Sequence, residues 1–113
     1  MVLQYRAARD IGFELMRAVN SPNVKLLYDV YHMQLMQGNH VNMINENIDF
    51  IGHFHSAGVP GRHELIDNEI NYPFIIKAAD AAGYKGYFGF EYWPTYDNDK
   101  SVKDTVEYLR KNT

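Results

Sequence analysis

Three side chains with the chemistry of metal ligands each stand at the end of a short apolar run. They are Asp29, His55 and Glu91, and each run has the apolar and aromatic composition of a buried strand. One imidazole and two carboxylates suit a divalent cation, with Mn²⁺ or Mg²⁺ preferred and Co²⁺ or Zn²⁺ as alternatives. A single polar residue at a strand end can equally be satisfied by nearby backbone. The recurrence in three successive runs favours metal or catalytic use.

Other residues near these run ends are candidates for binding a substrate. His32 could face the oxygens of a substrate, or be a solvated loop histidine. Arg62 could hold a carboxylate or hydroxyls through its two-pronged guanidinium, or be a surface arginine. Glu64 is expected to pair with Arg62 or His63.

Aromatic and histidine residues beside the same run ends have simpler interpretations. His53 lies two residues before His55, and is therefore expected on the same strand face, one layer deeper, as a core histidine. Tyr92 and Trp93 follow Glu91 directly and could form the wall of a sugar-sized pocket.

The elements that would position these residues alternate between strands and helices. Strands are predicted over 24–28, 50–55 and 84–92, and helices over 4–19, 41–48, 72–82 and 101–111. Asn71 is a candidate N-cap for the third of these helices, and Gly83 a candidate C-terminal cap. Loops are predicted over 34–40, 56–71 and 93–99. The order α-βα-βα-βα predicts an α/β fold with parallel strands.

Parallel strands present their carboxyl ends at one rim, where the active sites of barrels and doubly wound sheets lie. The three candidate ligands are therefore expected to converge there. A closed barrel needs eight strands and typically about 250 residues, so three strands give only part of one. Residues 1–113 are thus interpreted as a single, incomplete domain. Either an N-terminal part of the barrel is missing, or copies assemble into a homo-oligomer.

Composition narrows the class of protein. The chain has 113 residues, 46% of them hydrophobic and 14% aromatic, which is typical of a globular domain. The net charge is −3, and the scattered basic residues argue against a nucleic-acid or membrane partner. The absence of cysteine excludes disulfides and thiolate chemistry. No apolar run approaches the ~18 residues of a membrane span, and no signal-peptide pattern is found. A cytoplasmic protein is the default expectation.

Four segments carry a resemblance to a known family: 25–34 (KLLYDVYHMQ), 51–55 (IGHFH), 69–72 (EINY) and 86–92 (GYFGFEY). They resemble the C-terminal part of hydroxypyruvate isomerases and of the wider xylose-isomerase-like sugar isomerases and epimerases. The resemblance runs from about residue 6 to the end. It implies a partial (β/α)₈ TIM barrel, of which this chain holds the last three βα units.

The resemblance also implies roles for individual residues. The family's metal ligands fall on Asp29, His55 and Glu91, and its substrate contacts fall on His32 and Arg62. Hydroxypyruvate isomerases tend to have glutamine where His55 stands, whereas the epimerase branch has histidine. Of the two catalytic glutamates of the family, Glu91 matches the second.

The implied reaction is a metal-dependent isomerisation or epimerisation of a small hydroxy-carbonyl compound through a cis-enediolate. The first catalytic glutamate would come from an earlier strand, so the lone chain is expected to be weakly active or inactive. An alternative is a non-catalytic remnant or assembly module that keeps the barrel site. A related metal-dependent endonuclease is a weaker alternative, because it would need more metal ligands and a basic surface.

Overall fold

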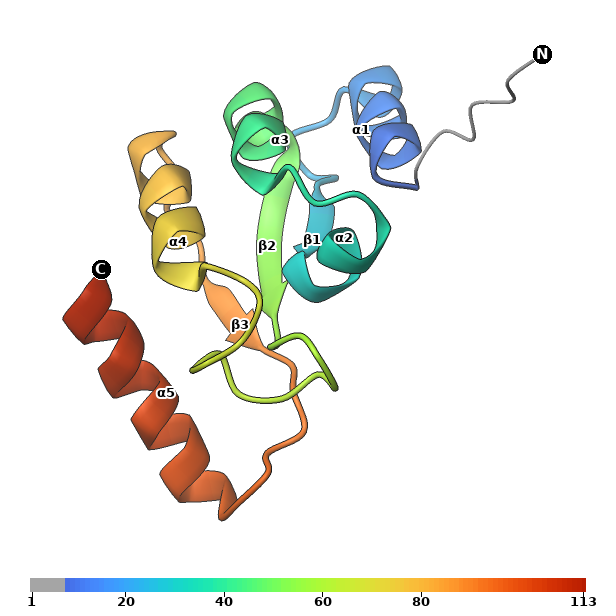
Figure 1. Ribbon diagram of the computed structural model, residues 1–113. Coiled ribbons are helices and arrows are strands. Elements are labelled where there is room, and N and C mark those ends of the chain that lie inside the picture. Colours follow the sequence, from blue (N-terminus) through green and yellow to red (C-terminus); the bar gives the residue numbers. More distant parts are fainter. Residues whose placement is uncertain (1–7) are drawn as a thin grey trace.

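A three-stranded parallel sheet forms the centre of the computed structural model, which describes residues 8–113 (Figure 1). The strands are β1 (Leu26–Asp29), β2 (Ile51–Ser56) and β3 (Phe88–Phe90), in the order β1-β2-β3. Asp29 is paired with His55, and Ser56 with Phe90, so all three strands end at one rim. The predicted α/β class with parallel strands is confirmed.

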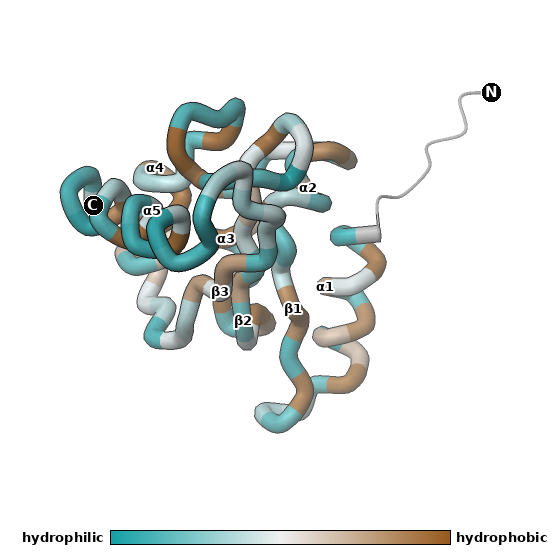
Figure 2. The backbone as a smooth tube through the Cα atoms, turned by 90° about the horizontal axis from the view of Figure 1, so that it is seen from below, coloured by the Kyte–Doolittle hydropathy of each residue, from teal (hydrophilic) through white to brown (hydrophobic). Residues whose placement is uncertain are grey.

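Helices connect the strands and cover one side of the sheet. They are α1 (Ala8–Val19), α2 (Val30–Met36), α3 (His40–Asn47), the 3₁₀ helix η1 (Ile48–Phe50), α4 (Tyr72–Ala81) and α5 (Asn98–Asn112). Figure 2 shows α3 and α4 on one side of the strands, with α1 beside β1. None of the helices within residues 8–113 is long and apolar enough to cross a membrane.

The helix-facing side of the sheet holds the core. Tyr28 and Phe54 are completely buried, and the Phe54 ring stacks on Phe88 with 4.3 Å between centroids. The opposite face is open, since the side chain of Leu27 is 49% exposed. An open face is what three strands of an incomplete barrel are expected to have, because the helices of this chain supply only one covering layer.

The ends of α4 follow the predicted capping chemistry. The Asn71 side chain accepts a hydrogen bond from the Phe74 N–H at 3.3 Å, which satisfies one of the free donors of the first turn. Gly83 follows the helix with φ of 95°, a conformation that costs little only for glycine. Both predicted caps are confirmed.

Several predicted boundaries differ from the structure, among them the start of β1 at Leu26 and the start of α5 at Asn98. The predicted loop over 34–40 begins inside α2, which runs to Met36 because Asp29 caps a helix directly after β1. The third strand is shorter than the predicted 84–92, because Tyr84 packs its ring edge-on against Phe54 rather than pairing in the sheet. Residues 4–7 of the first predicted helix lie outside the described residues.

Candidate active site

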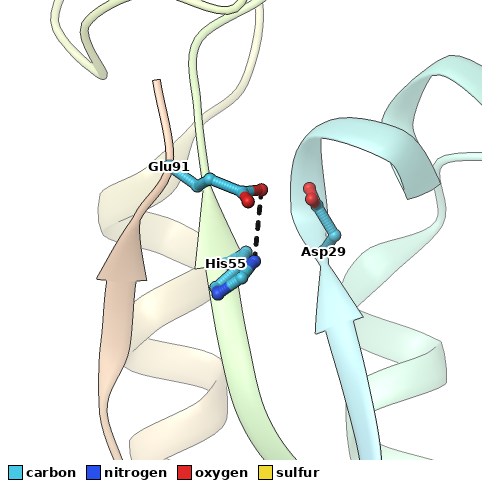
Figure 3. A group of neighbouring side chains, drawn as sticks. All are labelled: Asp29, His55 and Glu91. Atoms are coloured by element: carbon cyan, nitrogen blue, oxygen red, sulfur yellow. Dashed lines mark ion pairs between the residues drawn. The ribbon is translucent and has the colours of Figure 1, made fainter. Parts of the chain in front are cut away.

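Asp29, His55 and Glu91 point toward one another above the carboxyl ends of the three strands (Figure 3). One ligand atom from each lies within 4.8 Å of the others. His55 Nδ1 is 3.2 Å from a carboxylate oxygen of Glu91. The Glu91 N–H donates to the Ser56 carbonyl at 2.9 Å, which extends the β2–β3 pairing by one residue and fixes where Glu91 begins. The predicted convergence is confirmed, whereas the metal-binding role stays a prediction.

The donor set fits a divalent cation. Two ligand atoms that each lie about 2.2 Å from one ion can be at most about 4.4 Å apart. The three ligand atoms lie within 4.8 Å of one another, and a small side-chain rotation would close the difference. Two carboxylates and one neutral imidazole are also the ligands that Mn²⁺ accepts.

Arg62 brings a positive charge to the same two carboxylates. Its Nη2 donates to Asp29 Oδ2 at 3.3 Å and to a carboxylate oxygen of Glu91, and its Nε donates to the Glu91 carbonyl at 3.1 Å. The guanidinium lies 5.1 Å from the centre of the Tyr31 ring, a cation–π distance. The predicted candidate Arg62 thus lies in the site, where it offsets the repulsion between Asp29 and Glu91.

His32 lies at the rim, beside Arg62. Its Nε2 is 3.1 Å from Arg62 Nη1 and 3.7 Å from Asp29 Oδ2. Because a guanidinium only donates, Nε2 is the acceptor and the ring proton is on Nδ1. The side chain is 50% exposed, so the imidazole can reach a molecule that enters from solvent.

An open hollow of about 460 Å³ adjoins Glu91 and Arg62 and can admit a small molecule. It is lined by Arg62, Phe90, Glu91, Tyr92 and Trp93. The predicted placement of Tyr92 and Trp93 beside the site is confirmed. His53 lies on the same strand face, one layer deeper, with its ring centroid 5.2 Å from that of His55. It is half-buried rather than in the core, because it faces the open side of the sheet.

Glu64 differs from the prediction. It pairs with neither Arg62 nor His63 but accepts hydrogen bonds from Thr95 and Ser101. Burial raises the pKa of its carboxyl, but the hydrogen bonds from Thr95 and Ser101 outweigh that effect and the net pKa is lowered. Sequence reasoning missed these partners because they lie 31 and 37 residues away and no local pattern connects them.

Sequence comparison finds a matching family and several relatives of this chain. Residues 8–112 match the family described as xylose isomerase-like TIM barrel. The 2-oxo-tetronate isomerase of Pectobacterium atrosepticum is 40% identical over 108 residues, which are 96% of this chain and 39% of that protein. The hydroxypyruvate isomerase of Escherichia coli is 40% identical over 92 residues, 81% of this chain and 36% of that protein. The chain therefore spans less than half the length of the relatives it matches.

Solved structures share the fold. A 3-keto-D-glucoside 4-epimerase from E. coli superimposes with a TM-score of 0.81 at 21% identity, over 91% of this chain and 39% of that one. A D-allulose 3-epimerase from Methylomonas sp. gives a TM-score of 0.81 at 18% identity, over 94% of this chain and 43% of that one. The three strands and their helices thus have the arrangement of part of a larger barrel.

Proposed function

Since the chain belongs to the xylose isomerase-like TIM barrel family, we propose that it is the C-terminal part of a metal-dependent isomerase for small hydroxy-carbonyl acids. The observation that carries the proposal is the convergence of Asp29, His55 and Glu91 at one rim of the sheet. The substrate class follows from relatives that are named for hydroxypyruvate and 2-oxo-tetronate, both of which are 2-oxo acids. Epimerisation of a ketose is the neighbouring alternative on the same fold.

The metal would be held by Asp29, His55 and Glu91. When bound, Mn²⁺ or Mg²⁺ polarises adjacent carbonyl and hydroxyl oxygens and acidifies the C–H bond between them. Three protein ligands leave room for a further ligand and for substrate oxygens around an ion of this kind.

Glu91 would exchange a proton with one of the two neighbouring carbon atoms. In one direction its carboxylate removes the C–H proton, and the electron pair of that bond forms the double bond of a cis-enediolate. A second carboxylic acid then protonates the adjacent carbon, while the proton of the hydroxyl group passes to the former carbonyl oxygen, which completes the shift of the carbonyl group. We place this second group in the first five βα units of the barrel.

Arg62 and His32 would bind the substrate. The guanidinium that now contacts Asp29 and Glu91 can donate instead to the carboxylate of a 2-oxo acid, in the bidentate geometry that arginine favours. His32 can offer a hydrogen bond to a hydroxyl at the rim. The open hollow beside Glu91 has the size for such a molecule.

One observation favours the alternative of a non-catalytic module. Arg62 contacts both carboxylates and offsets one of their two negative charges without a metal ion. In a non-catalytic remnant, the site would keep this ion pair and carry out no reaction. Turnover by the completed barrel separates the two proposals, since a remnant that keeps the site can still bind Mn²⁺.

The deciding experiment mixes this chain with a second chain that carries the first five βα units of a relative. We expect turnover of hydroxypyruvate or a 2-oxo-tetronate with Mn²⁺ or Mg²⁺, and little or none by this chain alone. Glu91→Gln in the mixture should lower turnover by roughly 10²–10⁴-fold, the usual effect of losing a general acid–base group. Glu107→Gln, on the exposed side of α5, is the matched control.

The outcomes are distinct. Turnover that survives Glu91→Gln would overturn the mechanism. A mixture that closes into a barrel yet turns over no substrate would establish the remnant, whether or not it binds Mn²⁺.

A further inference from the structure

The loop after β2 and the segment after β3 run side by side and are joined by hydrogen bonds between their backbones and side chains. The Trp93 N–H donates to the Arg62 carbonyl at 2.8 Å, and His63 Nδ1 is 2.7 Å from the Trp93 carbonyl. Arg62 Nε closes the same ladder at 3.1 Å from the Glu91 carbonyl. The loop that carries the substrate-binding candidate is therefore joined directly to the segment that carries Glu91.

Glu64 is the buried end of this ladder. Its Oε1 accepts from the Thr95 N–H and from the Ser101 hydroxyl, both at 2.8 Å, and its Oε2 accepts from the Thr95 hydroxyl at 3.0 Å. The residue is 8% exposed, and Ser101 is completely buried in the first turns of α5. One carboxylate thus connects the loop after β2, the segment after β3 and the start of α5.

We propose that Glu64 is a positioning residue that holds Arg62 against Asp29 and Glu91 by fixing its loop to Thr95 and Ser101. This inference rests on the proposed function for the role of Arg62 toward substrate. Arg62 itself has a φ of 64°, which a non-glycine residue adopts only at a cost. Contacts close to Arg62 in the sequence help to keep that conformation, and Glu64 supplies them on the C-terminal side, two residues later.

Two other features of the loop agree with this role. Among the described residues, the Glu64 carboxylate is hydrogen-bonded to Thr95 and Ser101 and not to the candidate metal ligands. Gly58 is packed so closely beneath it that an added Cβ would lie 2.1 Å from the Glu64 carbonyl oxygen. The backbone of Glu64 is therefore packed against Gly58, and its side chain is hydrogen-bonded to Thr95 and Ser101.

The test follows the Arg62 Nε–H group by NMR in the ¹⁵N-labelled full chain, with the signal assigned by its loss in Arg62→Lys. We expect Glu64→Ala to speed exchange of this proton with water by at least roughly tenfold, as expected when a local contact opens. Glu64→Gln should keep the native rate, because its amide oxygen can accept from the Thr95 N–H while its amide NH₂ donates to the Thr95 hydroxyl oxygen. Glu107→Ala on the exposed face of α5 is the control.

A second variant, Thr95→Val, removes one hydroxyl donor and keeps the shape of the side chain, so it tests the contact if Glu64→Ala does not fold. It should speed the same exchange by a smaller factor, and Thr95→Ser should restore the native rate. A change confined to residues 62–64 and 93–95, with β2 amides unaltered, is the pattern of a positioning contact. Uniform loosening of the whole chain, or an Arg62 Nε–H that is indifferent to Glu64→Ala and Thr95→Val, would overturn the proposal.

Affinity for Mn²⁺ gives a second measurement that a merely structural role would not move in this direction. Arg62 competes with a cation for Asp29 and Glu91, so releasing it by Glu64→Ala should tighten Mn²⁺ binding. Arg62→Ala should tighten it equally, and the double variant should add nothing further. Weaker binding in Glu64→Ala would contradict the proposal. If no variant binds Mn²⁺, the proposed function is decided by the mixture with the first five βα units, while the NMR result still decides the role of Glu64.

Discussion

The two carboxylate oxygens of Asp29 make different contacts. Oδ1 accepts from the His32 N–H at 3.2 Å and caps α2, whereas Oδ2 faces Arg62 and the other candidate ligands. Asparagine caps a helix about as well as aspartate but carries no charge. Asp29→Asn should therefore leave thermal stability nearly unchanged while weakening Mn²⁺ binding at least about tenfold, since even residues behind the ligands contribute that much.

Asp29→Ala is the matched comparison, because it removes both the charge and the cap. It should weaken Mn²⁺ binding similarly and also cost about 1 kcal/mol of stability. Isothermal titration with Mn²⁺ and thermal unfolding of the same samples measure the two effects separately. Equal Mn²⁺ affinity in the wild type and in Asp29→Asn would remove Asp29 from the ligand set.

The sequence predicts the positions of some site residues better than those of others. Asp29, His55 and Glu91 were predictable because each directly follows an apolar run, and parallel strands bring their ends together. The sequence left two interpretations of Arg62, a substrate-binding residue or a surface residue. Its placement depends on a left-handed backbone conformation within a long loop. The partners of Glu64 were beyond reach, since they are set by the packing of α5 rather than by any spacing.

At the scale of elements, Tyr72 joins the first turn of α4 to the end of β2. Its hydroxyl donates to the Ala57 carbonyl at 2.7 Å and accepts from the Ala57 N–H at 2.9 Å, and the ring is completely buried. Burial raises the pKa of this hydroxyl, so it stays protonated. Tyr72→Phe would leave two buried backbone groups without partners, at a cost on the order of 3 kcal/mol.

Urea unfolding of the two proteins measures that loss. Tyr87→Phe is the control, since Tyr87 is 81% exposed and its hydroxyl is accessible to water. A Tyr72→Phe variant as stable as the Tyr87→Phe control would show that water replaces the lost hydroxyl at Ala57.

The elements themselves were predictable where capping and periodicity agree, and less so elsewhere. The start of α4 could be predicted because Asn71 and Pro73 mark it locally. The helix α2 was missed because it begins one residue after β1, so Asp29 reads as a strand end although it is also an N-cap. The length of β3 depends on pairing with β2, and sequence composition alone does not determine where that pairing stops.

At the scale of the whole molecule, a buried network connects α1, β1, α2 and α3. Arg9 donates to the Tyr28 hydroxyl at 3.4 Å, and that hydroxyl lies 2.9 Å from His40 Nδ1. His40 Nε2 lies 2.9 Å from Gln34 Oε1, so the neutral ring accepts at Nδ1 and donates at Nε2. Protonation would place a second positive charge beside Arg9 and remove the acceptor that faces Tyr28.

This network makes stability depend on pH. Burial, with a smaller contribution from the charge of Arg9, lowers the pKa of His40 from 6.5 to about 4. Between pH 6.5 and 4 the unfolded chain binds a proton at His40 and the folded chain does not, so stability is full above pH 6.5 and falls as the pH drops toward 4. The loss should be on the order of 3 kcal/mol, at 1.36 kcal/mol per pKa unit.

His40→Asn is the test variant, because its amide oxygen can still accept from Tyr28 but does not titrate. Urea unfolding at a series of pH values should give a flatter curve between pH 6.5 and 4 than the wild type gives. Parallel curves for the two proteins would assign the pH dependence to other groups.

The open surfaces of the chain predict that it associates with other chains. Within residues 8–113, β1 and β3 each pair on one side only, with β2. The apolar residues Ile11, Leu15 and Val19 line α1 at spacings of four and are 44%, 56% and 50% exposed, and Leu27 on the open sheet face is 49% exposed. Bare strand edges beside apolar surface favour pairing with another chain.

Sedimentation equilibrium at micromolar concentration should therefore show self-association, and a chain with the first five βα units should convert it to a one-to-one complex. Leu15→Lys should weaken both, whereas Glu107→Lys on the polar face of α5 should weaken neither. A folded monomer of 13.1 kDa that unfolds cooperatively at that concentration would contradict the prediction, because one covered sheet face would then suffice for stability.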